Sequence, residues 1–570
     1  MKESVTEIIS RSVKKSFPDE ASMPPVFLER PKNRSHGDYA TNIAMTLASK
    51  LKKNPREIAA KIVDNIDDSV GIIDHCEIAG PGFINIILTQ DFLRNILLRI
   101  HEEVEMFGSG NIGCGESVNI EFVSANPTGP LHVGHGRGAA VGDALARIMS
   151  KAGYDVTREY YWNDAGNQIR NLGVSINYRI RELKEPAFSK SIPFPENGYQ
   201  GDYVKEDIAE VLAAGASTVI PINLGKICSL PPEEISDSSA LTAETSGSAG
   251  AKIMEGKILQ ALENFGGITF DVQQSEKELH EQRDVERTID YFSDKGFIYE
   301  KDGAKWFRST DFGDDKDRVV KKKDGSLTYL AADIAYHKKK LDKGYDRIID
   351  IWGADHHGYI PRVRGAIEAM GFNPTKFNVL LVQMVTLLRG GKPVTMSKRS
   401  GEFVTLQDVI DEVGSDAARF FFLMRRYDSQ LEFDLDLAKK TTADNPVFYV
   451  QYMHARICSI LRKAEEEGLP LPSFKEVKLN LLSERDELNL IKFLASFPEI
   501  VEGSAMAMEP HRITFFLQDL AIEFHSYYNK TRIITDDVEL SKARLYLIAS
   551  IKTVVKNALT LIGINAPERM

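Results

Sequence analysis

The chain has 570 residues, and at about 150 residues per domain this length corresponds to about four domains, which excludes a peptide hormone, a lone binding module or a disulfide miniprotein. The composition, 43% hydrophobic and 27% charged, excludes wholesale disorder and fibrous repeats. The formal net charge of −11 argues against a protein that coats nucleic acid indiscriminately, because such binding needs a broad cationic surface.

The cysteines and the N-terminal residues indicate a reducing, cytoplasmic compartment. Cys76, Cys114, Cys228 and Cys458 include no CxxC pair, and their spacing suits neither a disulfide framework nor a zinc site. The first seven residues are polar and include acids, unlike a signal or transit peptide. No run of about 18 uncharged apolar residues occurs. We therefore expect a cytoplasmic protein with no membrane span and no structural metal.

Residues 1 to about 110 predict a small α+β unit. A helical stretch over 39–66 is followed by short strands at 76–78 and 83–87, separated by a Gly-Pro-Gly turn at 80–82. Between positions 30 and 61 the sequence has eight basic residues and only two acidic ones, Asp38 and Glu57. This excess of positive charge fits either a local RNA-binding patch or a solvated helix face. The basic residues are Arg30, Lys32, Arg34, Lys50, Lys52, Lys53, Arg56 and Lys61.

The next segment alternates between strand and helix. A strand at 118–123, a helix with an apolar face over 140–149 and a strand at 155–162 predict a right-handed βαβ crossover in a parallel sheet. Further buried parallel strands are predicted at 347–352 and 378–383. A nucleotide would bind beyond the carboxyl ends of such strands, where helix N-termini gather.

The periodic pattern is lost between about 184 and 270, where we expect a peripheral insertion with a flexible, small-residue loop at 236–250. After about 430 the pattern is helical, notably over 446–466 and 514–561. The expected fold is multidomain α/β: a Rossmann-type parallel-sheet domain at 113–430 that carries the insertion, an N-terminal α+β domain at 1–112 and a C-terminal all-helical domain at 431–570.

Two glycine patterns resemble dinucleotide-binding turns. The GxGxxG at 108–113 lies between a helix and a strand, the reverse of the required order. The GxGxxA at 134–139, with Glu159 downstream, leaves an NAD-dependent dehydrogenase as an alternative, although residues 126–131 make the turn long for that purpose. The Gly-Lys pairs at 225, 256 and 391 are followed by Ile or Pro, which excludes a P-loop.

His132 and His135 lie at the predicted start of the helix in this crossover. Imidazoles three residues apart share a helix face beside backbone N–H groups that attract phosphate, and Gly134 leaves room for a flat base. A pair of structural histidines is the other interpretation. A second element, Val394-Thr395-Met396-Ser397-Lys398-Arg399-Ser400-Gly401, could close over a polyphosphate as a cationic loop.

Together, in this order, the two elements resemble the HIGH and KMSKS signatures of class I aminoacyl-tRNA synthetases. Several segments, and the ending at 566–570, narrow the resemblance to the arginyl-tRNA synthetase family, over nearly the whole chain. These segments are EFVSANP at 121–127, YWNDAGNQ at 161–168, GYQGDY at 198–203, LTYLAADIAY at 327–336 and WGADHHG at 352–358. Thr395 departs from the signature, which has a lysine there.

The resemblance implies an enzyme that activates L-arginine with ATP and Mg²⁺ and transfers it from arginyl-adenylate to the 3′-terminal adenosine of tRNA-Arg. Catalysis would involve His132, His135 and Lys398. ATP would be bound by His132, Gly134, His135, Asp355, His356, Met396, Ser397 and Lys398. Arginine would be bound by Glu121, Ser124, Asn126, Glu276, Tyr329 and Asp333, and tRNA by Arg34, Tyr39, Tyr449, Tyr452 and Arg456. A monomer is expected.

Elementary chemistry agrees with this substrate. A guanidinium is a planar cation with five donors, so a selective pocket needs carboxylates placed for forked pairing. Tyr329 and Asp333, four residues apart, would lie on one side of a helix. Another class I synthetase remains an alternative, although a cysteine-specific one would need a zinc site. A synthetase-like RNA-binding regulator without catalysis is a further alternative.

Overall fold

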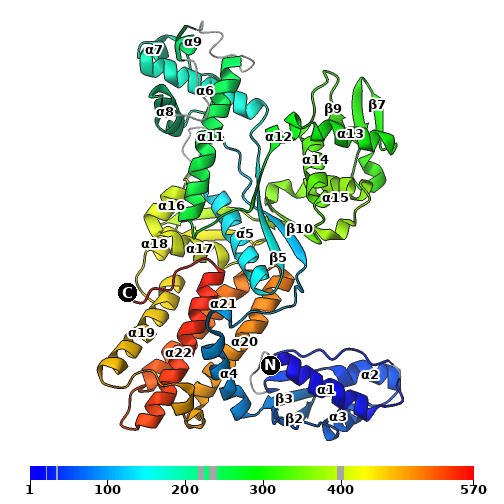
Figure 1. The fold of residues 1–570 in the computed structure, drawn as a ribbon, viewed down its shortest axis with the longest axis vertical. Coiled ribbons are helices and arrows are strands. Elements are labelled where there is room, and N and C mark those ends of the chain that lie inside the picture. Colours follow the sequence, from blue (N-terminus) through cyan, green and yellow to red (C-terminus); the bar gives the residue numbers. More distant parts are fainter. Residues whose placement is uncertain (21, 32, 34–35, 216–223, 230–240, 395–403) are drawn as a thin grey trace.

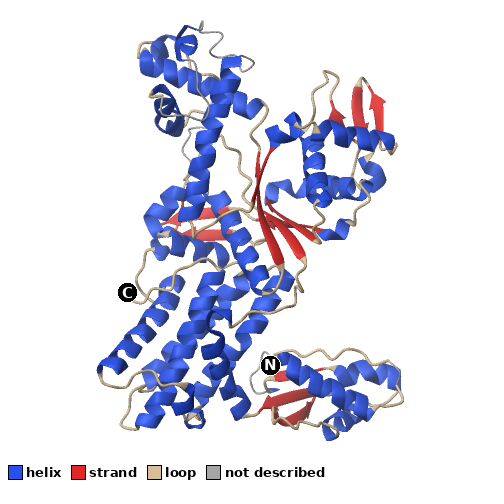
Figure 2. Ribbon diagram, viewed as in Figure 1, coloured by secondary structure: helices blue, strands red, loops and turns tan. Residues whose placement is uncertain are grey.

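The computed structural model describes residues 1–570 except 21, 32, 34–35, 216–223, 230–240 and 395–403. Figure 1 shows an elongated molecule in which a central sheet joins an insertion above, a small unit to one side and a helical bundle below, with the N-terminal unit beside the foot of the bundle. Figure 2 shows that the strands concentrate in that centre and in small peripheral sheets.

The N-terminal unit packs helices on a three-stranded antiparallel sheet of order β1-β3-β2. The helix predicted over 39–66 is wrong as one element: the chain forms a strand and then two helices. Lys52 adopts a left-handed conformation that ends the first helix, and the Asn54 side chain caps the next, which has Pro55 at its first position. The elements are α1 (Lys2–Ser16), β1 (Tyr39–Thr41), α2 (Ile43–Leu51), α3 (Pro55–Asp64), β2 (Ile73–Ala79) and β3 (Phe83–Leu88).

The central sheet is parallel and five-stranded, with order β11-β10-β4-β5-β6. The predicted βαβ crossover is confirmed, since β4 and β5 pair in parallel on either side of α5 in sequence. The chain proceeds from β4 outward to β6 on one side and returns through β10 to β11 on the other. The topological switch point, where ligands bind in open α/β sheets, therefore lies between β4 and β10. The elements are β4 (Ser117–Glu121), α5 (Val133–Lys151), β5 (Asp155–Trp162), β6 (Val272–Ser275), β10 (Arg347–Gly353) and β11 (Phe377–Val382).

The insertion is helical, and residues 241–250 of the predicted flexible loop instead form part of a long helix, α11. Its small residues, Thr245 to Gly250, lie where α11 packs against α6. A side chain on Gly173 or Gly247 would strike the other helix's backbone, so the small residues permit close helix packing. The elements are α6 (Asn167–Lys184), α7 (Phe188–Ser191), η3 (Val204–Ala209), α8 (Glu210–Ala213), α9 (Leu224–Ser229) and α11 (Leu241–Asn264).

Between β6 and β11, four helices and a small antiparallel sheet of order β7-β8-β9 form a unit with its own hydrophobic core. Its elements are α12 (Glu276–Glu281), α13 (Asp284–Asp294), β7 (Ile298–Lys301), β8 (Ala304–Phe307), η4 (Ser309–Phe312), β9 (Arg318–Lys321), α14 (Tyr329–Asp342), η5 (Ala354–Tyr359), α15 (Ile360–Ala369) and η6 (Pro374–Lys376). The helix α14 lies over β10 and β4, so it connects this unit to the switch point.

A third small sheet, of order β13-β12-β14, precedes the helical bundle. These elements are β12 (Val385–Arg389), β13 (Lys392–Pro393), α16 (Leu406–Val413), α17 (Ser415–Leu423), β14 (Leu431–Asp434) and α18 (Leu435–Ala438). The chain is therefore not wholly helical after 430, because β14 pairs in parallel with β12.

The bundle confirms the helix predicted at 446–466 and divides the one predicted at 514–561 into two, with a break at 531–537. Its elements are α4 (Gln90–Glu103), η2 (Val104–Met106), α19 (Pro446–Glu466), η7 (Phe474–Glu476), η8 (Leu479–Leu481), α20 (Arg485–Ala507), α21 (His511–Lys530) and α22 (Val538–Leu561). One hydrophobic core runs from the N-terminal unit through the central sheet into this bundle. In the described part of the chain, no helix has both the length and the apolar character of a membrane span.

Candidate active site

The turn that follows β4 at the switch point has a strained backbone. Val123 and Ser124 have φ angles of 70° and 40°, a left-handed region that residues other than glycine rarely adopt. The Ser124 hydroxyl donates to Glu121 Oε1 at 2.8 Å and accepts from the Tyr161 N–H at 3.2 Å. These bonds tie the turn to β4 and β5. Such strain is characteristic of functional sites, where the surrounding structure maintains it.

Asn126, two residues beyond, donates through Nδ2 to Gln168 Oε1 at the start of α6. The adjoining segment is covered by the GYQGDY motif, because Tyr203 donates to the Thr128 carbonyl at 2.8 Å and its ring lies against Gly129. The structure thus brings Glu121, Ser124 and Asn126 together along one short stretch, as the sequence predicts.

His132 and His135 begin α5 as a reciprocal cap. His132 Nδ1 accepts from the Gly134 and His135 N–H groups at 3.1 and 3.4 Å, and His135 Nδ1 accepts from the His132 N–H at 3.3 Å. The two rings stack with centroids 3.6 Å apart. Because both Nδ1 atoms accept, a proton on either ring lies on Nε2.

Gly134 serves a purpose that the sequence did not reveal. A Cβ there would lie 3.0 Å from His132 Cε1, so the space above the glycine is taken up by the capping imidazole. The predicted room for an adenine at Gly134 is therefore smaller than expected. Gly134 also lies inside the first turn of α5, and not in a tight turn before the helix, so the dinucleotide-binding alternative lacks its required geometry.

Most of the cationic loop, including Thr395, Met396, Ser397 and Lys398, lies outside the described residues. The segment that follows it is anchored to the histidine turn: Thr405 pairs with His132 in an isolated bridge, and the Leu406 N–H donates to the Leu131 carbonyl at 2.7 Å. The chain that continues from the loop thus joins the start of α5 by backbone hydrogen bonds.

Glu276 and Asp333 are neighbouring carboxylates that accept from tyrosine hydroxyls, and we call this cluster the acidic pocket. Glu276 is 6% exposed at the start of α12, and its Oε2 accepts from the Tyr161 hydroxyl at 3.1 Å. The Tyr359 hydroxyl donates to Asp333 on α14. Among the described residues, no Lys or Arg lies within ion-pair distance of either carboxylate, although His280 Nε2 lies 3.7 Å from Glu276. The pocket therefore has an excess of acceptors.

Burial, with smaller contributions from the nearby carboxylates of Asp333 and Asp164, raises the pKa of Glu276 to about 7 against the opposing Tyr161 hydrogen bond. Burial also raises the pKa of Asp333, against its bond from Tyr359. Because their pKa values are raised, these carboxylates ionise less readily than usual. A cationic ligand beside them would favour their charged form, so the site suits a cation.

Tyr329 lies one turn before Asp333 on α14, and, as predicted, α14 begins at Tyr329. The Thr328 hydroxyl caps the helix by accepting from the Ala331 N–H, and the Tyr329 side chain is 57% exposed. An exposed aromatic ring one helical turn from a carboxylate can cover the flat face of a guanidinium.

Asp355 and His356 follow β10 in η5, at the carboxyl end of the sheet. Both side chains are exposed, and His356 Nε2 lies 3.7 Å from Asp355 Oδ2. They lie beyond the carboxyl end of β10, the end of an open α/β sheet at which ligands bind.

Tyr39 corrects one prediction. Its side chain is fully buried and donates to Glu499 on α20, and Arg30 Nη2 donates to the Tyr39 hydroxyl at 2.9 Å. Arg30 also pairs with Glu499 at 2.8 Å. Tyr39 therefore joins the N-terminal unit to the bundle and offers no surface to RNA. Arg34 lies outside the described residues.

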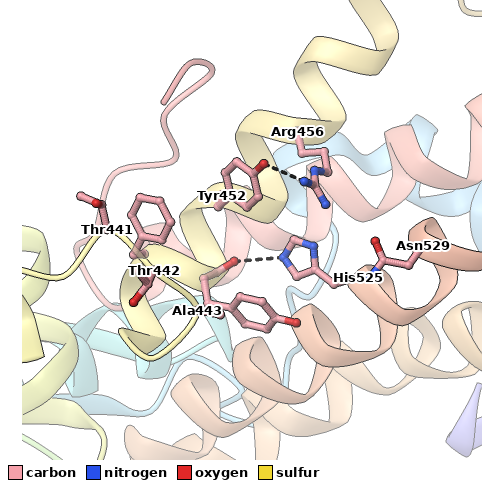
Figure 3. A pocket seen from close by; sticks show the side chains of 9 residues that line it. Thr441, Thr442, Ala443, Tyr452, Arg456, His525 and Asn529 are labelled. Carbon is pink, nitrogen blue, oxygen red and sulfur yellow. Dashed lines mark hydrogen bonds between the residues drawn. The ribbon is translucent and has the colours of Figure 1, made fainter.

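Tyr449, Tyr452 and Arg456 lie together on the face of α19 that is turned toward α21. They line a pocket of about 520 Å³ with Phe448 and His525. Figure 3 shows Tyr452 and Arg456 beside His525 from the facing helix α21. Arg456 Nη2 donates to the Tyr452 hydroxyl at 2.6 Å, and its guanidinium lies 4.5 Å from that ring's centroid. Partly exposed rings with a stacked cation suit unpaired bases.

Several residues near the site were given no role by the sequence. Tyr161 and Tyr359 supply the hydroxyls on the acidic pocket, and Tyr161 occurs in a segment already noted for resemblance. Arg137, one turn into α5, is fully buried and donates to the carbonyls of Gln383, Ser429 and Arg426. A basic residue among apolar helix positions was the only available signal. In the described residues, no group of three or more His, Cys, Asp or Glu side chains is arranged to hold a metal ion.

Three family models match the chain: "Arginyl tRNA synthetase N terminal domain" at 3–88, "tRNA synthetases class I (R), catalytic domain" at 108–214 and 253–431, and "DALR anticodon binding domain" at 450–570. The chain is 49% identical to an arginine–tRNA ligase of Syntrophotalea carbinolica over the full length of both chains. It is 47% identical to one of Bacillus licheniformis, covering 100% of this chain and 99% of that one. The Thermus thermophilus arginyl-tRNA synthetase structure, 20% identical, has the same fold with a TM-score of 0.75, covering 100% of each chain.

Proposed function

This chain belongs to the arginyl-tRNA synthetase family, and from that premise we propose how its residues carry the reaction. The chain is a class I arginine–tRNA ligase: it is an enzyme that joins arginine to tRNA-Arg with the use of ATP. The observation on which the substrate assignment depends is the pair of carboxylates, buried Glu276 and half-buried Asp333, held by tyrosine hydroxyls.

Glu276 and Asp333 bind the guanidinium, and the Tyr329 ring covers it. Two carboxylates match the forked donors of arginine, and lysine would leave acceptors unpaired in a buried site, which rejects it strongly. Glu121, Ser124 and Asn126, on the strained turn at the end of β4, hold the ammonium and carboxylate end. Specificity of this kind requires no editing domain.

His132 and His135 donate from Nε2 to the ATP phosphates, with the N-terminus of α5 adding its partial positive charge. Asp355 and His356 bind the nucleotide from the end of β10. Gly134, Met396, Ser397 and Lys398 complete the ATP site, and Lys398 neutralises pyrophosphate. Mg²⁺ bound together with ATP would supply positive charge to the phosphates.

The arginine carboxylate attacks the α-phosphorus in line and expels pyrophosphate. A ribose hydroxyl of the terminal tRNA adenosine then attacks the arginyl carbonyl and releases AMP. The protein contributes mainly placement and charge stabilisation to both steps. Lys398→Ala should therefore remove about 3 kcal/mol of transition-state stabilisation and slow ATP–pyrophosphate exchange accordingly.

Tyr449, Tyr452 and Arg456 bind unpaired bases of the tRNA, supported by their shared pocket on α19. The enzyme acts as a monomer in the cytoplasm, and light scattering of the purified protein would measure its mass. The domain division at 1–112, 113–430 and 431–570 stays a prediction.

The direct test is aminoacylation of total tRNA with each amino acid in turn, in the presence of ATP and Mg²⁺. We expect charging with arginine and background levels with lysine. Folded protein that charges no tRNA with arginine would refute the function, and charging with lysine at a comparable rate would refute the role of the acidic pocket.

A further inference from the structure

A buried ion network lies beneath the two ends of the proposed arginine site. Asp333, Tyr336, His337 and Lys340 follow one another at helical spacing on α14 and face the sheet. Tyr336, His337 and Lys340 are at most 3% exposed, and their partners Glu121 and Asp350 are 6% and 0% exposed. Charged groups are this deeply buried only when they are paired.

Lys340 occupies the centre of the network. Its Nζ donates to Glu121 at the end of β4 and, at 2.9 Å, to Asp350 Oδ1 on β10. Glu121 and Asp350 are directly paired residues of the two strands, so the ammonium separates two carboxylates that would otherwise face each other. Burial opposes the charge of Lys340, but Asp350 and Glu121 outweigh it and raise its pKa.

His337 links the network to the guanidinium end of the site. Its Nδ1 lies 2.8 Å from the Asp333 carbonyl and its Nε2 lies 3.0 Å from Asp350 Oδ2. Both neighbours are acceptors, so this geometry favours a ring that carries a proton on each nitrogen. Burial works against this charge, but the Asp350 bond prevails and raises the pKa of His337.

Tyr336 joins the same network to both ends of the site. Its hydroxyl donates to Glu121 Oε2 at 2.9 Å. Its ring packs against Tyr161, with centroids 4.4 Å apart, and Tyr161 donates to Glu276. One side of the Glu121 carboxylate thus accepts from Tyr336 and Lys340, while the other accepts from Ser124.

We propose that Tyr336, His337 and Lys340 are positioning residues that hold Glu121 and Asp333 at a fixed separation, so that one buried network aligns both ends of arginine. This rests on the proposed roles of Glu121 and Asp333. The network fixes the distance between Glu121 and Asp333. The affinity of a ligand that reaches only one of them does not depend on this distance, whereas the affinity of whole arginine does, because arginine binds both ends at once. Preorganisation of this kind increases affinity by removing the need for rearrangement on binding.

The test compares whole arginine with n-butylguanidine, which engages only the acidic pocket. In Tyr336→Phe, which keeps the ring and removes only the hydroxyl, we expect arginine to bind about tenfold more weakly, since a hydrogen bond to a charged group is lost. The inhibition constant of n-butylguanidine and the KM for ATP should stay within about twofold. Lys340→Met should show the same split more strongly. Lys338→Met should show none, because Lys338 is half-buried on α14 and pairs with Asp342 rather than with the network.

Parallel weakening of arginine and n-butylguanidine, or no weakening of either, would overturn the proposal. If Lys340→Met does not fold, Tyr336→Phe still decides. A cycle with Glu121→Gln adds a second criterion: once Glu121 is neutral, Tyr336→Phe should weaken arginine by no more than about twofold further, because its partner has changed. A full additional tenfold loss would show that Tyr336 does not act through Glu121.

Failure of the proposed site roles gives a different result. If Glu121→Gln and Asp333→Asn leave arginine binding unchanged, those roles are wrong and the positioning proposal falls with them. If both substitutions weaken arginine while Tyr336→Phe and Lys340→Met do not, only the positioning proposal is wrong.

Discussion

Gly173 of α6 and Gly247 of α11 bring two helices into backbone contact: a Cβ on Gly173 would lie 2.7 Å from the Gly247 nitrogen and directly against the Ala243 carbonyl. A Cβ on Gly247 would in turn strike the Ile169 carbonyl. The opposing atoms are main-chain atoms, which cannot rotate away. The insertion therefore depends on glycine at both positions.

Replacing either glycine with alanine should destabilise the insertion. We expect Gly173→Ala and Gly247→Ala each to cost about 3 kcal/mol, the upper range for overpacking. Hydrogen exchange of α6 and α11 would measure the change. Gly256→Ala is the matched control, because Gly256 is exposed on the same helix with no atom near its Cβ position. It should stabilise α11 by about 0.5–1 kcal/mol, and equal effects at all three sites would contradict the packing argument.

Glu276→Gln should weaken arginine binding by about 2–4 kcal/mol, or roughly 30- to 1000-fold, because one partner of a buried charge pair is removed. Calorimetric titration with L-arginine would measure it. Glu278→Gln changes an exposed carboxylate on the same helix and should leave affinity within about twofold. A small effect of Glu276→Gln would show that Glu276 does not bind the guanidinium.

Arginine binding should depend on pH. The pKa of Glu276 is raised to about 7 by burial, so below that pH the free protein holds a proton that the guanidinium must displace. Affinity should fall as pH decreases below about 7, by at most about tenfold per unit for this one group, and level off above it. Titration in buffers of different ionisation enthalpy would detect the released proton. In Glu276→Gln the dependence should become shallower, and an unchanged slope would assign it to another group.

Arg456→Ala should raise the KM for tRNA about tenfold, within the range for a lost stacking contact with a base, and leave the KM for arginine unchanged. Aminoacylation kinetics with each substrate varied would separate the two. Lys463→Ala removes an exposed cation from the same helix, where it pairs with Glu467, and controls for net charge. Equal effects of the two variants would point to general electrostatic attraction rather than a contact.

The parallel crossover was predictable because its periodicity is local: β5 has its predicted bounds, 155–162, and α5 covers the predicted apolar face. The helices α6 and α11 were not anticipated as a pair, because the small residues that permit their contact look like loop composition until the partner helix is known. In the N-terminal unit, Asn54-Pro55 is a signal for the start of a helix, and the prediction of one helix over 39–66 did not take it into account.

The placement of candidate residues was predictable where a motif lies in one segment, as with the helix starts at His132 and His135 and at Tyr329. It was not predictable where burial decides. Tyr39 occurs among basic residues that suggest an RNA surface, yet its hydroxyl meets Glu499, far later in the chain. Lys340 is one of three consecutive lysines, and only the fold distinguishes the buried one.

The helix α4 precedes the central sheet in sequence, yet Leu93, Ile96, Leu97 and Ile100 are buried in the bundle core, where α4 packs against α20 and α22. A protein shortened by removal of residues 1–112 would thus lose one wall of the bundle together with the small N-terminal sheet. Trimming at Leu88, where the first family match also stops, would spare that wall. The position of the truncation therefore decides whether it removes the N-terminal unit alone or also disrupts the helical bundle.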